Sequence, residues 1–341
     1  ALHEESRAYF PLGRMYESGR GARTDTGEAA KWYLKAAYAG EARAQYNIAT
    51  MYSTGSGVRK NHAEAVKWFA KAAEQDNAEA QYKYGYYLET GRGVKKNIAE
   101  AVQWYRKAAD AGNVEAMYAL GENYADGHGV PKSESEAAKL YHLAAKKGHS
   151  KAQYKLGLMY SLGKTVKENH GVAADWFAKS AAQGYAPAQY SLARSYSQGS
   201  GVQQSDGQAV SWFQKAAKQG HDRAQFYLAY SYEHGTGVKT DYGSAVQWYT
   251  QSARNGHADA QYRLGLLKCF GKGTGQSYSE AVKWWKEASR KGDSMSMFFL
   301  GYMYETGTGV KRNMVTAKEY YGRAAQGGNV YAKQTLNILG H

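Results

Sequence analysis

The amino-acid sequence predicts an all-α fold, a solenoid of nine tandem helix–turn–helix repeats that are each 36 residues long. The first observation is that tryptophan recurs every 36 residues or at twice that distance. Two further observations are glycines in the same register and two stretches of helical apolar spacing in each unit. The tryptophans are Trp32, Trp68, Trp104, Trp176, Trp212, Trp248 and Trp284, and Leu140 and Tyr320 fill the two remaining places.

Glycines predict where the first helix of every repeat ends. In repeat 2, Ala44, Ile48 and Met51 recur on one helical face, and the segment 55–57 (GSG) follows them. Glycine adopts a left-handed backbone conformation without steric cost, so it suits a helix end. The first glycine column is unbroken and comprises Gly19, Gly55, Gly91, Gly127, Gly163, Gly199, Gly235, Gly271 and Gly307. Two residues later, eight of the nine repeats again have glycine, and Thr165 is the exception.

A column of polar residues predicts where the second helix begins. Its nine members are Asp25, Asn61, Asn97, Ser133, Asn169, Ser205, Asp241, Ser277 and Asn313. All have side chains that accept a hydrogen bond from exposed amides at a helix start. Glutamate or glutamine follows three residues later in six repeats, which predicts capping boxes. Within the second helix, Trp68 and its equivalents are expected to present large buried surfaces.

The whole chain, residues 1–341, is predicted to form a single solenoid domain. The repeats lie at about 5–40, 41–76, 77–112, 113–148, 149–184, 185–220, 221–256, 257–292 and 293–328. Residues 329–341 restart a first helix and stop, so they are expected to form a C-terminal capping helix. Pro11 lies inside the first helix of repeat 1, and we expect it to fray the start of that helix.

Three segments of repeat 2 resemble the Sel1-like repeat, which is similar to the tetratricopeptide repeat but has a longer loop between its helices. They are residues 44–52 (AQYNIATMY), 55–58 (GSGV) and 65–69 (AVKWF), and the resemblance extends over essentially the whole chain. It implies a right-handed superhelix whose first helices line the concave surface, and an adaptor role in assembling protein complexes. Bacterial members are often secreted or periplasmic; some bind host proteins and some neutralise toxin effectors. Cysteine-rich members carry a disulfide in each repeat, and this chain departs from them because Cys269 is its only cysteine.

The sequence shows no pattern typical of catalysis, metal binding or cofactor binding. No histidine pair lies four residues apart beside a glutamate, and His149, His221 and His257 share a polar turn position between repeats. The glycine loops follow helices, whereas phosphate-binding loops follow strands. Cys269 has no base partner in the sequence and is expected to be partly exposed. We therefore expect no enzyme, no metal and no cofactor.

The formal net charge of +14 is compatible with an acidic protein, a membrane surface or nucleic acid as partner. Lysines of the second helices, such as Lys67 and Lys107, are expected on a solvated outer face, and other cations, such as Arg59, lie in the loops. Nucleic-acid binding normally uses a basic groove with exposed aromatics, but the aromatics here mostly form core columns. Nucleic acid is therefore the least favoured of the three partners. No run of about 18 apolar residues exists that would span a membrane.

A partner is expected along the first helices, on the side opposite the core. The column of Phe10 is aromatic in every repeat, so we interpret it first as a packing column. The column of Arg14 varies, and apolar or aromatic groups occur there at positions where water is expected. The predicted binding residues are Arg14, Tyr86, Glu122, Leu158, Leu162, Arg194, Tyr230, Leu266, Phe270 and Tyr302. Repeats 5 to 9 would carry the main anchor patch, and repeats 1 to 4 a mixed-charge patch.

These residues and the resemblance together predict a non-enzymatic adaptor, a monomer that binds a protein partner in its concave groove. The resemblance implies a host immune protein or an effector toxin as the partner. It also implies a periplasmic or secreted bacterial protein, with the cytoplasm as the alternative. Two other functions stay open: a hydrolase acting on cell-wall material, and a basic surface that binds nucleic acid or membrane.

Overall fold

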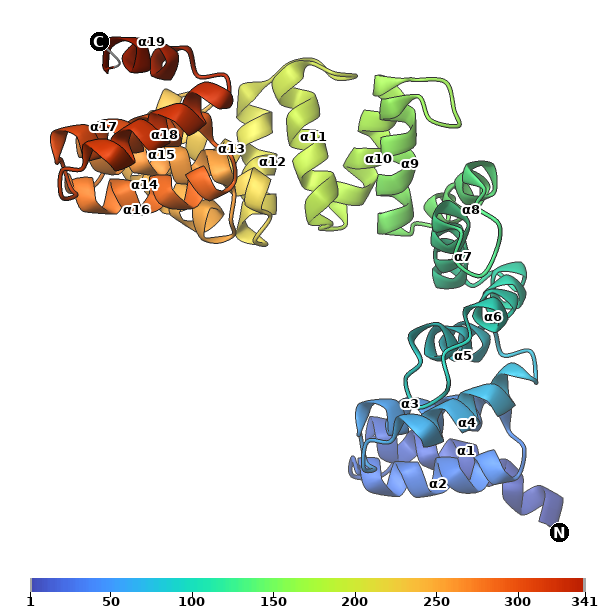
Figure 1. The fold of residues 1–341 in the computed structure, drawn as a ribbon. Coiled ribbons are helices and arrows are strands. Elements are labelled where there is room, and N and C mark those ends of the chain that lie inside the picture. Colours follow the sequence, from blue (N-terminus) through green and yellow to red (C-terminus); the bar gives the residue numbers. More distant parts are fainter. Residues whose placement is uncertain (1, 340–341) are drawn as a thin grey trace. The chain divides into compact units, whose positions relative to one another are not determined.

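The computed structural model describes the backbone of residues 2–339, in which every regular element is an α-helix (Figure 1). The helices are α1 (Leu2–Ser18), α2 (Thr26–Tyr38), α3 (Ala42–Thr54), α4 (His62–Ala73), α5 (Ala78–Thr90), α6 (Ile98–Asp110), α7 (Val114–Asp126), α8 (Glu134–Lys146), α9 (Ser150–Leu162), α10 (His170–Ala182), α11 (Ala186–Gln198), α12 (Asp206–Lys218), α13 (Asp222–His234), α14 (Tyr242–Arg254), α15 (Ala258–Phe270), α16 (Tyr278–Arg290), α17 (Ser294–Thr306), α18 (Met314–Gln326) and α19 (Val330–Leu339). Two helices in each repeat confirm the predicted all-α solenoid.

Contacts between helices group the chain into two units, residues 1–168 and 169–341. In the first unit each helix packs against the next from α1 to α9, and in the second unit from α10 to α19. Each unit is therefore a stack in which a helix touches its neighbours in sequence. This is the arrangement by which repeats too small to have their own core bury apolar surface together. The division of the chain into a single domain stays a prediction.

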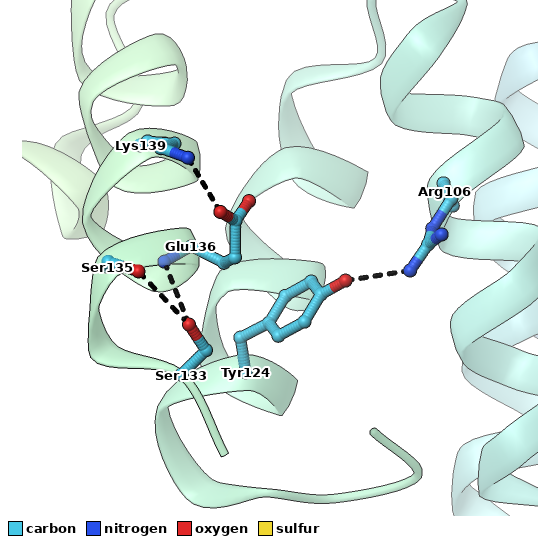
Figure 2. A network of polar contacts seen from close by, with 6 residues as sticks. All are labelled: Arg106, Tyr124, Ser133, Ser135, Glu136 and Lys139. Carbon is cyan, nitrogen blue, oxygen red and sulfur yellow. Dashed lines mark hydrogen bonds and ion pairs between the residues drawn. The ribbon is translucent and has the colours of Figure 1, made fainter. Parts of the chain in front are cut away.

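Both predicted sets of helix ends are confirmed. The glycine at the end of a first helix takes a left-handed conformation, with φ of 87° at Gly55 and 71° at Gly91. Every residue of the predicted N-cap column accepts a hydrogen bond from a backbone amide two or three residues later. Figure 2 shows one of them, the Ser133 hydroxyl, which accepts from the Glu136 amide at 3.3 Å.

The predicted capping boxes are only half made. The Glu136 carboxylate does not reach back to the N-cap amide but accepts from Lys139 Nζ at 2.6 Å (Figure 2). The Ser133 amide is already occupied, because it donates to the Tyr124 carbonyl at 2.8 Å across the loop. The Tyr124 hydroxyl in turn accepts from Arg106 of the preceding repeat at 2.7 Å. The Ser133 amide, which would donate to Glu136 in a complete capping box, is thus already bonded within the loop that joins the two helices.

The expectation that Pro11 frays the first helix is wrong, because α1 runs through it from Leu2 to Ser18. An internal proline removes one amide donor and crowds the carbonyl four residues earlier, but here the helix continues on both sides of it. The expectation for the tryptophan column holds at Trp68, which is 4% exposed, whereas the other six tryptophans of that column are half-buried. Lysines three residues later cover several of these rings; Lys215 Nζ lies 3.6 Å from the Trp212 ring centroid.

The residue after the tryptophan is the true core residue of each repeat. This core-ring column is Tyr33, Phe69, Tyr105, Tyr141, Phe177, Phe213, Tyr249, Trp285 and Tyr321, and every member is 4% exposed or less. The ring packs on the first helix at a position that is glycine or alanine in all nine repeats. A Cβ added to Gly85 would lie 2.8 Å from the Tyr105 ring, and one added to Gly301 2.6 Å from the Tyr321 ring. The two helices of a repeat are therefore held at a separation that a larger residue would not allow.

In four repeats a glutamate at one fixed position of the first helix accepts a hydrogen bond from the hydroxyl of a core tyrosine. The tyrosine hydroxyl donates to a glutamate 16 residues earlier in four repeats, at 2.5–2.9 Å: Tyr33 to Glu17, Tyr105 to Glu89, Tyr249 to Glu233 and Tyr321 to Glu305. Where the core ring is phenylalanine, the same position is serine, as at Ser53, Ser161 and Ser197. The carboxylate is thus present where a buried hydroxyl needs an acceptor.

A buried glutamine column joins consecutive repeats and was missed at the sequence level. Its side-chain amide donates to a carbonyl at the end of the preceding second helix, at 3.0–3.2 Å: Gln45 to Ala37, Gln81 to Ala73, Gln153 to Ala145, Gln189 to Ala181, Gln225 to Ala217 and Gln261 to Ala253. Each of these carbonyls also accepts from the backbone amide three residues later, so the glutamine is a second donor that ties the end of one repeat to the next.

Replacing Gly265 with alanine is predicted to destabilise the second unit by about 1–3 kcal/mol, because the new Cβ would collide with the Trp285 ring. Gly322→Ala is the matched control, since a Cβ there meets nothing within 4 Å and alanine favours a helix by up to about 1 kcal/mol. Urea unfolding followed by circular dichroism measures both. Equal stabilities for the two variants would contradict the close packing.

Tyr321→Phe is predicted to cost about 1–2 kcal/mol of stability, because the Glu305 carboxylate loses its donor in a partly buried place. The double variant Glu305→Ser, Tyr321→Phe reproduces the pairing of Ser197 with Phe213, and should regain most of that loss. Thermal unfolding of the single and double variants tests this coupling; purely additive losses would refute it.

Candidate functional site

The candidate site lies on the first helices, on a surface that we call the inner face. It comprises the column of Arg14 and the residues four positions after it, which include Leu162, His234 and Phe270. These positions repeat at the spacing that places residues on one side of a helix. The inner face is described for each unit in turn.

In the second unit the inner face exposes three large apolar rings on three consecutive first helices. Tyr230 on α13, Phe270 on α15 and Tyr302 on α17 are 36%, 63% and 50% exposed. Leu266 and Arg194, the other predicted residues of this unit, are half-buried. Scattered apolar side chains are normal on a soluble surface, but a run of large rings on one face is typical of an interaction site.

Contacts made by Arg263 show that the inner faces of α13 and α15 are continuous. The Arg263 guanidinium lies 5.6 Å from the centroid of the Tyr230 ring and 3.6 Å from a Glu233 carboxylate oxygen. On its other side, the Tyr230 ring stacks on His234 with centroids 3.9 Å apart. Tyr230 is therefore held by an imidazole and a guanidinium, which leaves its outer edge accessible in a fixed orientation.

In the first unit the inner face has a small apolar hollow of about 300 Å³ between repeats 4 and 5. Leu158 and Leu162 line it, together with Ala125 and Met159. Leu162 is 60% exposed, and Leu158 is half-buried. Ala125 stands where other repeats have glutamate, serine or cysteine, so the hollow arises where the usual polar side chain is missing.

Glu122, which was predicted to bind a partner, is engaged within the protein. Its carboxylate accepts from the Tyr141 hydroxyl, from the Tyr118 hydroxyl at 3.0 Å and from Lys155 Nζ at 3.0 Å. Burial alone would raise the pKa of Glu122, but the hydrogen bonds from Tyr141 and Lys155 outweigh it and lower that pKa. Glu122 thus replaces the glutamate that Ala125 lacks, as the acceptor for its core tyrosine.

The remaining predicted residues of the first unit lie apart from this hollow. Arg14 is exposed and lines a separate recess with Arg20 and Arg43. Tyr86 is half-buried against the edge of the Tyr87 ring, with their centroids 6.0 Å apart. The inner face of this unit consequently carries charge at one end and the leucine hollow at the other.

The histidine column between repeats has a structural role that explains its residue type. His149 and His221 cap first helices, because each Nδ1 accepts from the amide three residues later, at 3.1 and 3.2 Å. Histidines of this column also stack on an aromatic ring of the preceding repeat. The ring centroids of His221 and Tyr190 lie 4.7 Å apart, and so do those of His257 and Phe226. Burial of its charged form lowers the pKa of His221. The column of Phe10, to which these aromatics belong, also packs on the core rings, as the sequence predicted.

Cys269 is buried, with 7% of its surface exposed, so the expectation of partial exposure is wrong. It occupies the place of the glutamate or serine beside the core ring, which in this repeat is Trp285. Burial raises the pKa of the thiol, which disfavours the reactive thiolate. Across residues 6–339, no group of three His, Cys, Asp or Glu side chains is placed to hold a metal ion.

None of the helices between residues 2 and 339 combines the length and apolarity that crossing a bilayer requires.

A family model for the Sel1 repeat matches nine consecutive segments of the chain: residues 6–41, 42–77, 78–113, 114–149, 150–185, 186–221, 222–257, 258–293 and 294–329. No curated protein matches the chain. Among solved structures, it is similar to c5321, a protective antigen present in uropathogenic Escherichia coli strains that displays an SLR fold. The two are 35% identical with a TM-score of 0.88, over 99% of this chain and 73% of that one. A Sel1 repeat protein from Oxalobacter formigenes is 29% identical with a TM-score of 0.64, over 96% of this chain and 93% of that one.

The histidine column predicts that stability falls on acidification. The folded-state pKa of His221 lies below its ordinary 6.5. The contribution of neutral His221 to the free energy of unfolding is therefore complete above about pH 6.5 and is lost as the pH falls further. His221→Asn keeps a capping side chain of the kind found at Asn77 and Asn113, but has no charge to gain. The melting temperature of this variant should therefore fall less than that of the wild type between about pH 7.5 and about pH 5. An identical pH dependence in both proteins would contradict this role.

Proposed function

The chain belongs to the Sel1 repeat family, whose solenoid is a protein-interaction fold, and we propose that it is a non-enzymatic adaptor that binds one protein partner along its inner face. The main anchors are Tyr230, Leu266, Phe270 and Tyr302 in the second unit. The leucine hollow of the first unit is a secondary contact, and the protein acts as a monomer.

The observation that carries this proposal is the run of exposed rings on α13, α15 and α17. Aromatic side chains at the centre of an interface supply most of its binding energy, because they bury a large area at little cost in conformational entropy. The second unit exposes three such rings at equivalent or neighbouring positions of consecutive repeats. Scaffold positions are alike in every repeat, whereas this column differs from repeat to repeat. It is therefore free to fit one particular partner.

The residues around these rings indicate what the partner offers. Arg263 reaches over Tyr230, Arg194 occupies the same column one repeat earlier, and Arg223 lies at the start of α13. A partner surface that combines apolar side chains with carboxylates fits this arrangement, since charge complementarity favours the encounter and apolar contacts hold the complex.

We propose a host protein as the partner, and the periplasm or the exterior of a bacterium as the setting. This rests on the likeness to c5321, a protective antigen of uropathogenic Escherichia coli. Such an antigen is met by a host, and this chain shares its solenoid fold at 35% identity.

Capture of the partner from host serum or bacterial lysate, at low and moderate salt, gives the first test. Tyr230→Ala and Leu266→Ala are each predicted to weaken the captured complex by about 30-fold, because each removes an anchor contributing about 2 kcal/mol. Titration calorimetry with the purified partner measures the change. Retention of the partner at both salt concentrations is expected.

Val315→Ala is the matched control, because Val315 is 71% exposed on the second helix α18, away from the inner face. It should leave the affinity unchanged. If Tyr230→Ala and Leu266→Ala also leave the affinity unchanged, the inner face of the second unit is not the binding surface.

A further inference from the structure

The loops between the two helices of each repeat carry a concentration of cations in the first unit. Ten lysines and arginines lie in the loops of repeats 1 to 5, and all are exposed: Arg20, Arg23, Arg59, Lys60, Arg92, Lys95, Lys96, Lys132, Lys164 and Lys167. The four corresponding loops of the second unit hold only Lys239, Lys272, Lys311 and Arg312. The excess of charge is therefore a property of the first unit and not of the repeat itself.

In repeats 2 to 4 the loop lies directly against the preceding repeat, at the point where the second helix of that repeat begins. A Cβ added to the second glycine of the loop would collide with this helix start: Gly57 with Thr26, Gly93 with His62 and Gly129 with Ile98. A side chain at these glycines would collide with that backbone, so only glycine permits this closeness. The loops of repeats 1 to 4 are thus held next to one another, the loop of repeat 5 follows them in the same unit, and we call the ten loop cations the basic row.

One carboxylate, Glu168, lies in the loop of repeat 5 itself, and three glutamates beside the other loops are engaged by lysines of their own helices. Glu28, Glu64 and Glu136 lie just inside the second helices, and each accepts from a lysine one turn later at 2.6 Å. Within the described residues, no ion pair involves any of the ten cations. Arg92 alone has a ring contact, with its guanidinium 6.0 Å from the centroid of Tyr86. The charge of the row is therefore presented to solvent.

The row contains cations and nothing else that would anchor a ligand. The loops of repeats 1 to 4 contain no phenylalanine, tyrosine or tryptophan, and their valines, such as Val58 and Val94, pack inward against the core. Single-stranded nucleic acid is normally held by aromatic stacking in a basic groove, and a protein interface needs apolar anchors at its centre. Anionic headgroups of a bilayer require only exposed cations within the screening distance.

We propose that the basic row docks the first unit on an anionic lipid surface, with the loops of repeats 1 to 5 facing the headgroups. Ten cations suffice, because clusters of four to eight already give electrostatic membrane binding. The row lies on the loops and the anchor rings lie on the inner face of the second unit, so these two sets share no residue; Lys164 alone of the row also lines the leucine hollow. The proposal therefore does not depend on the protein-binding function.

Co-sedimentation with phosphatidylcholine vesicles that contain phosphatidylglycerol tests this docking. The full chain should bind these vesicles at low salt, release them as salt is added, and ignore vesicles of phosphatidylcholine alone. The triple variant Arg59→Ser, Lys95→Ser, Lys96→Ser should bind roughly 100-fold more weakly, because each cation contributes about fivefold. Serine keeps the Cβ that packs near Gly91, and circular dichroism verifies the fold.

A second triple variant, Lys146→Ser, Lys147→Ser, Lys151→Ser, is the matched control, because it also removes three exposed cations from the first unit but none from the row. It should keep most of the vesicle affinity. Equal losses in the two variants would mean that overall charge, and not the row, is responsible. Absence of binding to anionic vesicles, or tighter binding of duplex DNA through the same three loop residues, would overturn the proposal.

Discussion

The fold depends on one contact, the packing of the core ring of each second helix on a glycine or alanine of the first helix. The core rings are almost completely buried, and at Gly85 and Gly301 there is no room for even one additional carbon atom. Since this contact sets the separation of the two helices, it also sets the position at which the next repeat stacks. The other columns, including the glutamines that bond to the ends of preceding helices, are arranged around that separation.

The same contact explains which positions are free to acquire function. A residue beside the core ring must satisfy it, as Glu305 satisfies Tyr321, and so cannot change alone. Repeat 4 is the exception. Ala125 leaves Tyr141 without its usual acceptor, and Glu122 of the inner face accepts the hydrogen bond in its place. Glu122 is therefore not free to bind a partner. Residues one turn further from the ring, such as Phe270, contact no core group of this kind. They are able to differ between repeats without loss of stability.

The two proposed surfaces use different consequences of the repeat. The specificity of the inner face would come from residues that differ between repeats, because the column of Arg14 holds Tyr230, Leu266 and Tyr302 in three successive repeats. The basic row gains its strength from repetition, because nested loops place similar cations side by side. A solenoid presents both kinds of surface at once, since its loops and its first helices are exposed along its whole length.

The sequence by itself determined the all-α fold, the repeat register, the helix ends and the family, because each depends on local residue preferences repeated nine times. Local preference did not determine which aromatic residue forms the core. Trp212 and Phe213 are adjacent and both apolar. Only the packing of neighbouring helices decided that Phe213 is buried while a lysine covers Trp212. The burial of Cys269 and the internal hydrogen bonds of Glu122 were likewise decided by residues distant in sequence. The sequence did contain one unused signal, the matching of tyrosine with glutamate and phenylalanine with serine 16 residues apart. Its meaning became visible only when the tertiary structure placed the hydroxyl and the carboxylate within hydrogen-bond distance, since spacing alone does not reveal contact.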